Sequence, residues 1–452
     1  MLYLSTRGDS PAVNFAEAVS RGLAPDGGLY VPERLPDQSA LLMAPVDIGY
    51  ARFAEKWLAP FSSGLAPEEL ARCCDEAWRD FPEGDPAPIV RLSADLAMLE
   101  LFHGPTLAFK DFALQFLGRV QAVLARTTGA RVTVLGATSG DTGAAAVHAL
   151  PADAGRCVIL YPLGRVAPLA ERQMLIGVPP HCRALAIEGD FDACQAIVKE
   201  LLGDAEVRAK HSLTAVNSIN IARILAQSVY HARACARLGD EAFRRGVRLV
   251  VPSGNFGNAL AADYARRMGA PIREIVVATN ANDTLARFFN TGVYAPGDTK
   301  ATPAPAMDIA RPSNFERWLA LRLGGDGMAV KEALKSLARD GRWHDDRRDP
   351  VISATSMPDD RIRDAIRDLY SKFNYVIDPH TACAFAVPVP TGGPITLVAA
   401  TAHPAKFPES MLPALGFEPV HPALERLKSS PLTRTVLPAD ARAVLARLDD
   451  PR

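Results

Sequence analysis

The sequence predicts an α/β fold in which parallel strands are covered by helices on both faces. Short runs rich in β-branched residues alternate along the chain with longer stretches of helical pattern. Short apolar strands separated by helices are typical of buried parallel sheets. The runs that we expect to form strands span residues 132–135, 157–161, 184–187, 247–251, 274–278 and 395–400.

The region before these strands reads mostly as helices and turns. Prolines and glycines cluster at residues 22–32, which marks a break between elements. A second proline-rich patch at residues 81–88 cannot continue a helix and predicts a domain boundary. We therefore expect a mostly helical N-terminal domain over residues 1–92. A chain of 452 residues exceeds the usual size of one hydrophobic core, so further domains should follow.

Charge and cysteine content exclude several classes of function. Lysine plus arginine (50) nearly balance aspartate plus glutamate (51), so no overall field attracts nucleic acid or an anionic membrane. The seven cysteines are scattered without a C-x-x-C pair, which argues against disulfides and zinc and predicts a cytoplasmic location. The histidines form no metal-binding pattern, so we expect no metal. We expect neither secretion nor membrane insertion, since no signal-peptide pattern or membrane-length apolar run is present.

One lysine stands out because it follows an apolar residue and opens a run of helical pattern. Lys110 lies in the segment 103–112, beside Leu107, Phe109 and Phe112. A lysine that forms a Schiff base must be a neutral amine part of the time, and partial burial favours that form. The residues alone also fit a surface lysine extending from an amphipathic helix.

Two glycine-containing loops each lie between a predicted strand and a helical run. The first contains Thr138, Ser139, Gly140, Asp141 and Thr142, and the second contains Gly254, Asn255, Phe256, Gly257 and Asn258. The N–H groups at a helix start favour an anion, and glycine lets the main chain approach a phosphate closely. Neither loop has the spacing of a dinucleotide fingerprint or a P-loop. Each could equally be an ordinary capped turn.

Two further segments carry polar residues. Thr401 follows the strand predicted at 395–400, and ligands collect at the carboxyl ends of parallel strands. It could also be only a strand-edge threonine, and we expect His403 and Lys406 behind it to be exposed and solvated. In the segment 217–224, the polar side chains are Asn217, Ser218, Asn220 and Arg223. They could contact a phosphorylated group, or Asn217 or Ser218 could simply cap a helix.

Taken in order, these segments resemble the threonine synthase family of fold-type-II pyridoxal-phosphate enzymes. Residues 103–112 are close to its motif HGPTxAFKDxA, and the Ser-Gly-Asp-Thr-Gly loop, the Gly-Asn-Phe-Gly-Asn loop and Thr401 follow in the family's order. The resemblance implies a tryptophan synthase β-like fold with parallel or mixed sheets. It also implies a large pyridoxal-phosphate domain (93–122 and 236–452) and a small substrate-loop domain (123–235).

The resemblance also implies roles for the residues. Lys110 would carry pyridoxal 5'-phosphate and act as the base, residues 254–258 would hold its phosphate, and Thr401 would bond its ring nitrogen. Residues 138–142 would bind the substrate α-carboxylate, and the polar residues of 217–224 would line the pocket for the phosphorylated substrate. Ile221 stands where the family usually has tryptophan, which leaves details of this pocket open.

The implied reaction converts O-phospho-L-homoserine and water to L-threonine and phosphate. We expect this small molecule as the partner of a monomer or homodimer, with no nucleic acid and no membrane. The alternatives are a related phospholyase, a serine/threonine dehydratase, or a catalytically silent relative that binds a metabolite or a partner protein.

Overall fold

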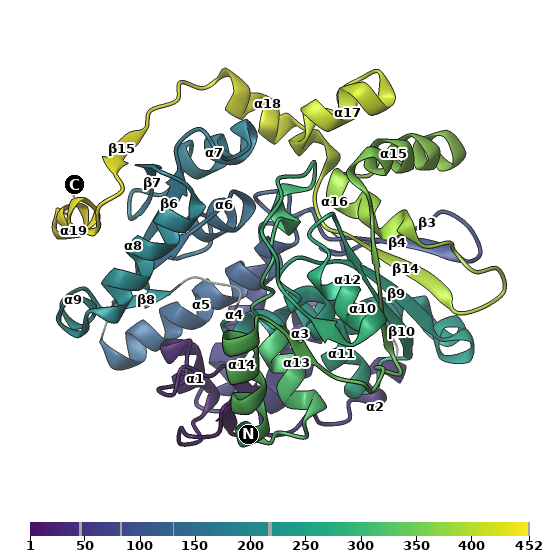
Figure 1. Cartoon of the computed structure of the whole chain (residues 1–452), viewed down its shortest axis with the longest axis horizontal. Coiled ribbons are helices and arrows are strands. Elements are labelled where there is room, and N and C mark those ends of the chain that lie inside the picture. The colour runs from purple at the N-terminus through teal and green to yellow at the C-terminus, as the bar shows by residue number, and fades with distance from the viewer. Residues whose placement is uncertain (45–47, 82–83, 130, 216–218, 451–452) are drawn as a thin grey trace.

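A computed structural model describes residues 1–44, 48–81, 84–129, 131–215 and 219–450. Within these ranges, two large sheets stand beside each other with helices around them, and the N-terminal elements lie below both in the view of Figure 1. The segment after β14 crosses from the larger sheet to the smaller one along the top of that view. The C-terminal elements therefore connect the two halves of the molecule.

The larger sheet has the strand order β13-β10-β9-β14-β4-β3 among the described residues. Neighbouring strands are parallel, except that β3 runs antiparallel to β4. Its strands are β3 (Ile89–Arg91), β4 (Leu96–Glu100), β9 (Val247–Pro252), β10 (Ile272–Thr279), β13 (Ile352–Ser356) and β14 (Ile395–Ala400). Strands β9 and β14 are buried along their whole length, as expected for a sheet covered on both faces.

The smaller sheet has the order β15-β7-β6-β5-β8, with all neighbouring pairs parallel. Its strands are β5 (Val132–Ala137), β6 (Gly155–Pro162), β7 (Cys182–Glu188), β8 (Leu213–Ala215) and β15 (Thr435–Pro438). The division into domains at residues 93–122, 123–235 and 236–452 stays a prediction. Strand β15 does not follow that division: it lies within residues 236–452 but pairs with β7 of the smaller sheet.

All six strands predicted from the sequence are confirmed, as parts of β5, β6, β7, β9, β10 and β14. The N-terminal region is mostly helical, as predicted. Its elements are β1 (Tyr3–Ser5), α1 (Phe15–Arg21), β2 (Tyr30–Pro32), α2 (Ser39–Met43), α3 (Tyr50–Leu58), the 3-10 helix η1 (Ala59–Phe61) and α4 (Pro67–Ala77).

The remaining helices surround the two sheets. The helices near the smaller sheet are α6 (Asp141–Val147), α7 (Pro168–Leu175), α8 (Phe191–Gly203), α9 (Ala205–His211) and α19 (Ala441–Asp449), and α18 (Pro422–Ser429) lies in the segment that leads to it from β14. The others are α5 (Lys110–Thr128), α10 (Ile221–Arg245), α11 (Gly257–Arg267), α12 (Thr284–Thr291), α13 (Phe315–Arg322), α14 (Gly327–Asp340), α15 (Asp359–Phe373), α16 (Pro379–Ala382) and α17 (Pro408–Leu415). Short pieces complete the chain: η2 (Pro305–Met307), η3 (Cys383–Ala386), η4 (Pro404–Lys406), and the strand pair β11 (Val293–Tyr294) and β12 (Trp343–His344).

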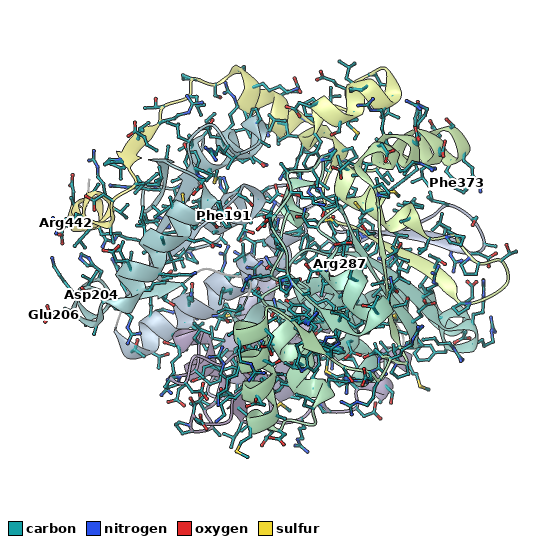
Figure 2. All side chains as sticks on the ribbon, viewed as in Figure 1. Phe191, Asp204, Glu206, Arg287, Phe373 and Arg442 are labelled. Carbon is teal, nitrogen blue, oxygen red and sulfur yellow. The ribbon has the colours of Figure 1, made fainter. Side chains whose placement is uncertain are left out.

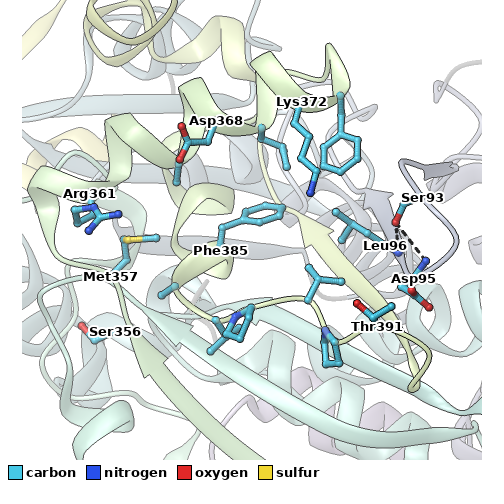
Figure 3. A pocket seen from close by; sticks show the side chains of 18 of the residues that line it. Ser93, Asp95, Leu96, Ser356, Met357, Arg361, Asp368, Lys372, Phe385 and Thr391 are labelled. Atoms are coloured by element: carbon cyan, nitrogen blue, oxygen red, sulfur yellow. Dashed lines mark hydrogen bonds between the residues drawn. The ribbon is translucent and has the colours of Figure 1, made fainter.

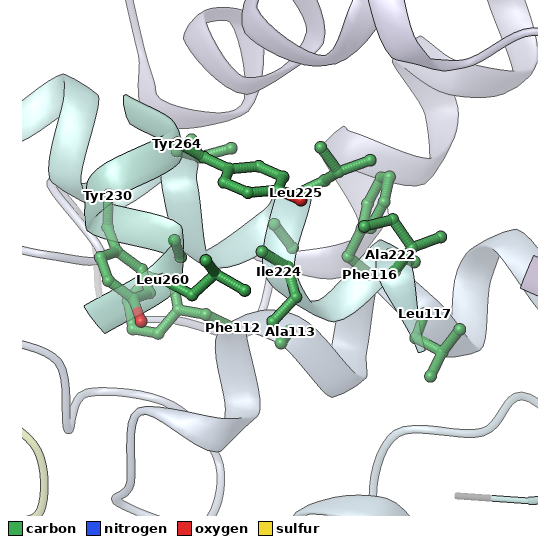
Figure 4. Packing of buried hydrophobic residues seen from close by; sticks show 14 of the residues in the cluster. Phe112, Ala113, Phe116, Leu117, Ala222, Ile224, Leu225, Tyr230, Leu260 and Tyr264 are labelled. Carbon is green, nitrogen blue, oxygen red and sulfur yellow. The ribbon is translucent and has the colours of Figure 1, made fainter. Parts of the chain in front are cut away.

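The main core forms where α5, α10 and α11 pack together (Figure 4). Phe112 and Phe116 of α5 are fully buried and lie beside Ile224 and Leu225 of α10. Burial on this scale stabilises each large side chain by about 1.5–3 kcal/mol. The first turn of α5, which begins with Lys110, is therefore held on a rigid support.

Charged side chains cover the outer surface. Asp204, Glu206 and Arg442 lie at the edge of the molecule on the side of the smaller sheet (Figure 2). Within the described ranges, no helix combines the length and the apolar character needed to cross a membrane.

Candidate active site

A tight turn places Lys110 at the first position of α5. Thr106 closes this turn by donating its hydroxyl to Asp111 Oδ1 (2.7 Å) and its backbone N–H to Asp111 Oδ2 (2.8 Å). Gly104 lies against the same carboxylate, since a Cβ there would be 2.5 Å from Asp111 Cβ. The glycine, threonine and aspartate of the motif thus shape the turn that presents the lysine.

The same turn is joined to the segment after β14. The N–H of Phe109 donates to the carbonyl of Thr401 (2.9 Å), and the N–H of His403 donates to the carbonyl of Leu107 (3.0 Å). Leu107 has a φ of +59°, a left-handed conformation that non-glycine residues adopt at a cost. These backbone bonds bring Thr401 beside Lys110, although the two are far apart in sequence.

A cavity of about 70 Å³ has Lys110 in its wall. Most of the residues predicted for the site meet around it. Those that line it are Lys110, Asp141, Thr142, Arg223, Gly254, Asn255, Phe256, Gly257, Asn258 and Thr401. Ser139 and Gly140 line a smaller neighbouring cavity of about 20 Å³, which shares Asp141 with the first. Loops from both sheets therefore converge on one place.

Two predicted residues lie outside the lining of both cavities. Thr138 is buried, and its hydroxyl accepts hydrogen bonds from the N–H groups of Gly140 (3.0 Å) and Gly143 (2.9 Å), so it shapes the loop. Asn220 caps the start of α10 and donates its amide to the carbonyl of Val19 (2.9 Å). Both have clear structural roles, and their contact with substrate stays a prediction.

Asn217 and Ser218 lie outside the described residues, so their predicted contact with substrate also stays a prediction.

The loop before α11 forms a close-fitting cradle. A Cβ on Gly254 would lie 3.0 Å from both Ile309 Cδ1 and Met307 Cα, so a larger residue would require these neighbours to move by a few tenths of an ångström. Phe256 has a φ of +64° and packs its ring 5.7 Å from that of Phe289. This left-handed residue turns the chain into the first turn of α11, whose N–H groups favour an anion.

Several buried donors around the cradle have no hydrogen-bond partner among the described residues. They are Ser253 Oγ, Asn258 Nδ2, and Nε and Nη1 of Arg223. The orientation of the Asn258 amide is fixed, because its Oδ1 accepts from Tyr230 Oη (2.7 Å) and His231 Nε2 (2.8 Å). Leaving buried donors unpaired is costly, so this set calls for an acceptor with several oxygens. The residues present fit a phosphate group.

Positive charge dominates this cavity. Burial lowers the pKa of Arg223 to about 10, and no carboxylate in the described part of the chain forms an ion pair with it. Burial also lowers the pKa of Lys110; the carboxylate of Asp141 opposes this shift, and the charges of Lys406 and Arg223 add to it. Lys110 Nζ lies 3.4 Å from Asp141 Oδ2 and its residue is only 9% exposed. Its amine is therefore easier to deprotonate than that of a surface lysine.

The expectation that Lys406 is exposed and solvated is wrong. Its residue is 3% exposed, and its Nζ lies 2.8 Å from Asp141 Oδ1. His403 is likewise not a free surface histidine, since its Nδ1 accepts from the N–H of Ala405 (3.1 Å). A basic residue after a strand is usually solvated, and here the packing of distant segments overrides that tendency.

The sequence favours a structural histidine at His380 and assigns no role to Ser253, and both residues line the Lys110 cavity. His380 Nδ1 lies 2.8 Å from Asp378 Oδ1, and its Nε2 accepts from the N–H of Ala306 (3.1 Å). Both ring nitrogens are thus engaged, which fixes the orientation of the ring. The signal for Ser253 was its place directly before Gly254 in the second glycine loop.

A larger cavity of about 620 Å³ lies elsewhere, between α15 and the segment 385–391. Figure 3 shows Asp368 and Lys372 of α15 on one side of Phe385, with Ser93 and Asp95 on the other. It shares no lining residue with the Lys110 cavity. Volume alone would therefore point away from the chemistry described above.

Comparison with known proteins gives the family. Three family models match: Threonine synthase N terminus over residues 2–78, Pyridoxal-phosphate dependent enzyme over 83–345, and Threonine synthase, C-terminal over 381–447. A threonine synthase from Pseudomonas aeruginosa is 40% identical over an alignment of 466 positions, gaps included, which covers 99% of this chain and 97% of that protein. The chain belongs to the threonine synthase family. The resemblance inferred from the motifs is confirmed.

Solved structures of the threonine synthase family have the same fold. A pyridoxal-phosphate-bound threonine synthase from Brucella melitensis superposes with a TM-score of 0.94 at 39% identity, covering 99% of this chain and 98% of that one. The yeast enzyme gives a TM-score of 0.91 at 33% identity, covering 100% and 98%. The predicted fold class, a fold-type-II pyridoxal-phosphate enzyme, is confirmed.

Proposed function

We propose that the chain converts O-phospho-L-homoserine and water to L-threonine and inorganic phosphate, the last step of threonine biosynthesis, with Lys110 as its catalytic lysine. It is a pyridoxal-phosphate-dependent lyase of the threonine synthase family. One observation carries the assignment of the site: the buried amine of Lys110 shares a cavity with unpartnered donors that suit phosphate.

The residues of the cradle would hold the cofactor. Lys110 would carry it, Ser253 and the loop from Gly254 to Asn258 would bind its phosphate, and the Thr401 hydroxyl would meet its ring nitrogen. Pyridoxal phosphate, when bound, withdraws electrons from the carbons next to the substrate nitrogen. A neutral hydroxyl at Thr401 would leave the ring nitrogen largely unprotonated and would so moderate this withdrawal.

Lys110 would act as the general base. Burial lowers the pKa of its amine, which makes the neutral form easier to reach, and that form can accept the α-proton of the substrate. Asp141, whose carboxylate lies 3.4 Å away, would receive a hydrogen bond from the protonated amine and hold the proton near the reacting carbons. The hydrophobic support of α5 holds Nζ in place for this proton transfer.

The two ends of the substrate would be held by different loops. Ser139, Gly140, Thr142 and the backbone N–H of Asp141 would bind the α-carboxylate at the start of α6, where backbone N–H groups favour an anion. Arg223 would bind the γ-phosphate, because its two unpartnered nitrogens can donate to two phosphate oxygens. Its charge would also stabilise the phosphate as it leaves.

The test is one reaction of purified protein with O-phospho-L-homoserine and pyridoxal phosphate, with phosphate and L-threonine measured together. Equal amounts of both support the proposal. Phosphate with a keto acid in place of threonine would indicate a different lyase, and no phosphate from cofactor-loaded protein would refute it. We further propose that the protein is a monomer or homodimer located in the cytoplasm. Its seven free cysteines support this location, because thiols stay reduced there.

A further inference from the structure

A second buried lysine contacts the same carboxylate as Lys110. Lys406 ends η4, directly after the segment that follows β14, and its Nζ lies 2.8 Å from Asp141 Oδ1. The same ammonium donates to the carbonyl of Thr106 at 2.8 Å. With 3% of the residue exposed, water does not screen these contacts.

Asp141 therefore stands between two ammonium groups. Its Oδ1 bonds Lys406, and its Oδ2 lies 3.4 Å from Lys110 Nζ. Asp141 begins α6 after β5 of the smaller sheet, whereas Lys110 follows β4 and Lys406 follows β14, which are both strands of the larger sheet. The shared carboxylate thus ties the substrate loop to the segment that carries the catalytic lysine.

The geometry points to Lys406 as a positioning residue, which holds Asp141 against the Lys110 turn and limits how strongly Asp141 stabilises the ammonium form of Lys110. This inference rests on the proposed role of Lys110 as the base. Thr106 completes the arrangement, because its carbonyl fixes the Lys406 ammonium while its hydroxyl and N–H fix the turn. Thr106 thereby holds both the turn that carries Lys110 and the ammonium group of Lys406.

The electrostatics agree with this geometry. Burial lowers the pKa of Lys110, Asp141 opposes the shift, and the charge of Lys406 adds to it. Burial by itself would raise the pKa of Asp141, but attraction to Lys406 and then to Lys110 holds that pKa well below its ordinary range. Without Lys406, the whole attraction of Asp141 would act on Lys110, and the amine would bind its proton more tightly.

The experiment compares holoenzymes of the wild type, Lys406→Met and Lys406→Arg. The first readout is the pH at which the absorbance of the bound cofactor changes, which reports protonation at the Lys110 nitrogen. Lys406→Met should move this midpoint upward by about one pH unit, and Lys406→Arg should return it toward the wild type. Lys428→Met, which removes an exposed lysine of α18, is the matched control and should leave the midpoint unchanged.

A double-mutant cycle with Asp141→Asn tests whether Lys406 acts through Asp141. In that background, adding Lys406→Met should shift the midpoint clearly less than it does in the wild type, because the shared carboxylate is already gone and only the direct repulsion between the two lysines remains. The double variant also removes both buried charges together, so it remains interpretable if Lys406→Met alone fails to fold.

Three results would overturn the inference. An unchanged midpoint in Lys406→Met would show that Lys406 does not influence the Lys110 nitrogen. A full effect of Lys406→Met in the Asp141→Asn background would show that it does not act through Asp141. A large rise in KM in both backgrounds, with the midpoint unmoved, would make Lys406 a substrate contact. The midpoint does not depend on the substrate, so failure of the proposed reaction would be seen separately.

Discussion

Arg223 offers the sharpest test of the proposed substrate site. Replacing it by methionine removes two buried nitrogens, Nε and Nη1, that have no partner among the described residues. A hydrogen bond to a charged group contributes about 1.5–3 kcal/mol, so two such bonds to the substrate phosphate would contribute at least about 3 kcal/mol. Since about 1.4 kcal/mol corresponds to a factor of ten, KM for O-phospho-L-homoserine should rise about a hundredfold.

In contrast to the loss of substrate binding, the stability of the substrate-free protein should not fall in Arg223→Met. Burial lowers the pKa of Arg223 to about 10, which shows that its charged form is destabilised where it lies. Methionine carries no charge and has a similar length, so Arg223→Met should leave the urea unfolding midpoint unchanged or higher. A variant that binds substrate far more weakly while unfolding no more easily would separate binding from folding.

The assay measures KM, kcat and the affinity for pyridoxal phosphate in the same preparation. The control is Arg119→Met, because Arg119 is also a partly buried arginine but contacts the Ala149 carbonyl (2.8 Å) and Glu76 away from the cavity. The control should lose stability and keep its KM. An unchanged KM in Arg223→Met, or a loss confined to cofactor affinity, would refute the assignment of Arg223 to the substrate phosphate.

Other changes test the remaining parts of the site and fold. Lys110→Ala should keep the circular dichroism spectrum and lose turnover, and near-normal activity would contradict its role as the base. Gly254→Ala should weaken cofactor affinity in a titration, because a Cβ would lie 3.0 Å from Ile309 Cδ1; unchanged affinity would count against the cradle. Phe112→Ala should reduce the free energy of unfolding in urea by about 3–5 kcal/mol, because the ring is fully buried. Burial lowers the pKa of His231 to about 4 in the folded state, from 6.5, so the unfolded chain binds a proton that the folded chain excludes. Stability should therefore be complete above about pH 6.5 and fall by about 2 kcal/mol toward pH 5. The urea midpoint at several pH values measures this loss, and the loss should be smaller by about 2 kcal/mol in a His231→Gln variant, where other partly buried histidines such as His403 still contribute.

Much of the fold and site follows from local sequence. Strands such as β5 and β9 were predicted because a buried parallel strand is a short apolar run, and a glycine loop then opens the next helix. Short elements gave weaker signals: β8 has three residues and β15 has four, and each gains its stability from a neighbouring strand. Such strands are specified by pairing partners far along the chain rather than by their own pattern.

The missed residues of the site have a related cause. Lys406 reads as a surface lysine, because nothing near it in sequence shows that the Thr106 carbonyl and the Asp141 carboxylate will enclose its ammonium. Asn220 and Thr138 show the opposite case: both lie in segments that match the family, but in the structure their side chains form hydrogen bonds with backbone groups and do not line the cavity. Local sequence indicates which residues can do chemistry, and the packing of distant segments determines which of them face the cavity.

The charge balance of the site explains how a nearly neutral protein can bind an anionic substrate. The whole chain carries a formal net charge of −1, which provides no long-range attraction. Among the described residues that line the two neighbouring cavities, Lys406 and Arg223 carry positive charge against the single carboxylate of Asp141, and Lys110 adds to this excess whenever its amine is protonated. Confined in a buried space, this excess is not screened by salt and demands anions such as a phosphate and a carboxylate. Asp141 then keeps the excess from being larger, and it is the group through which the two lysines act on each other.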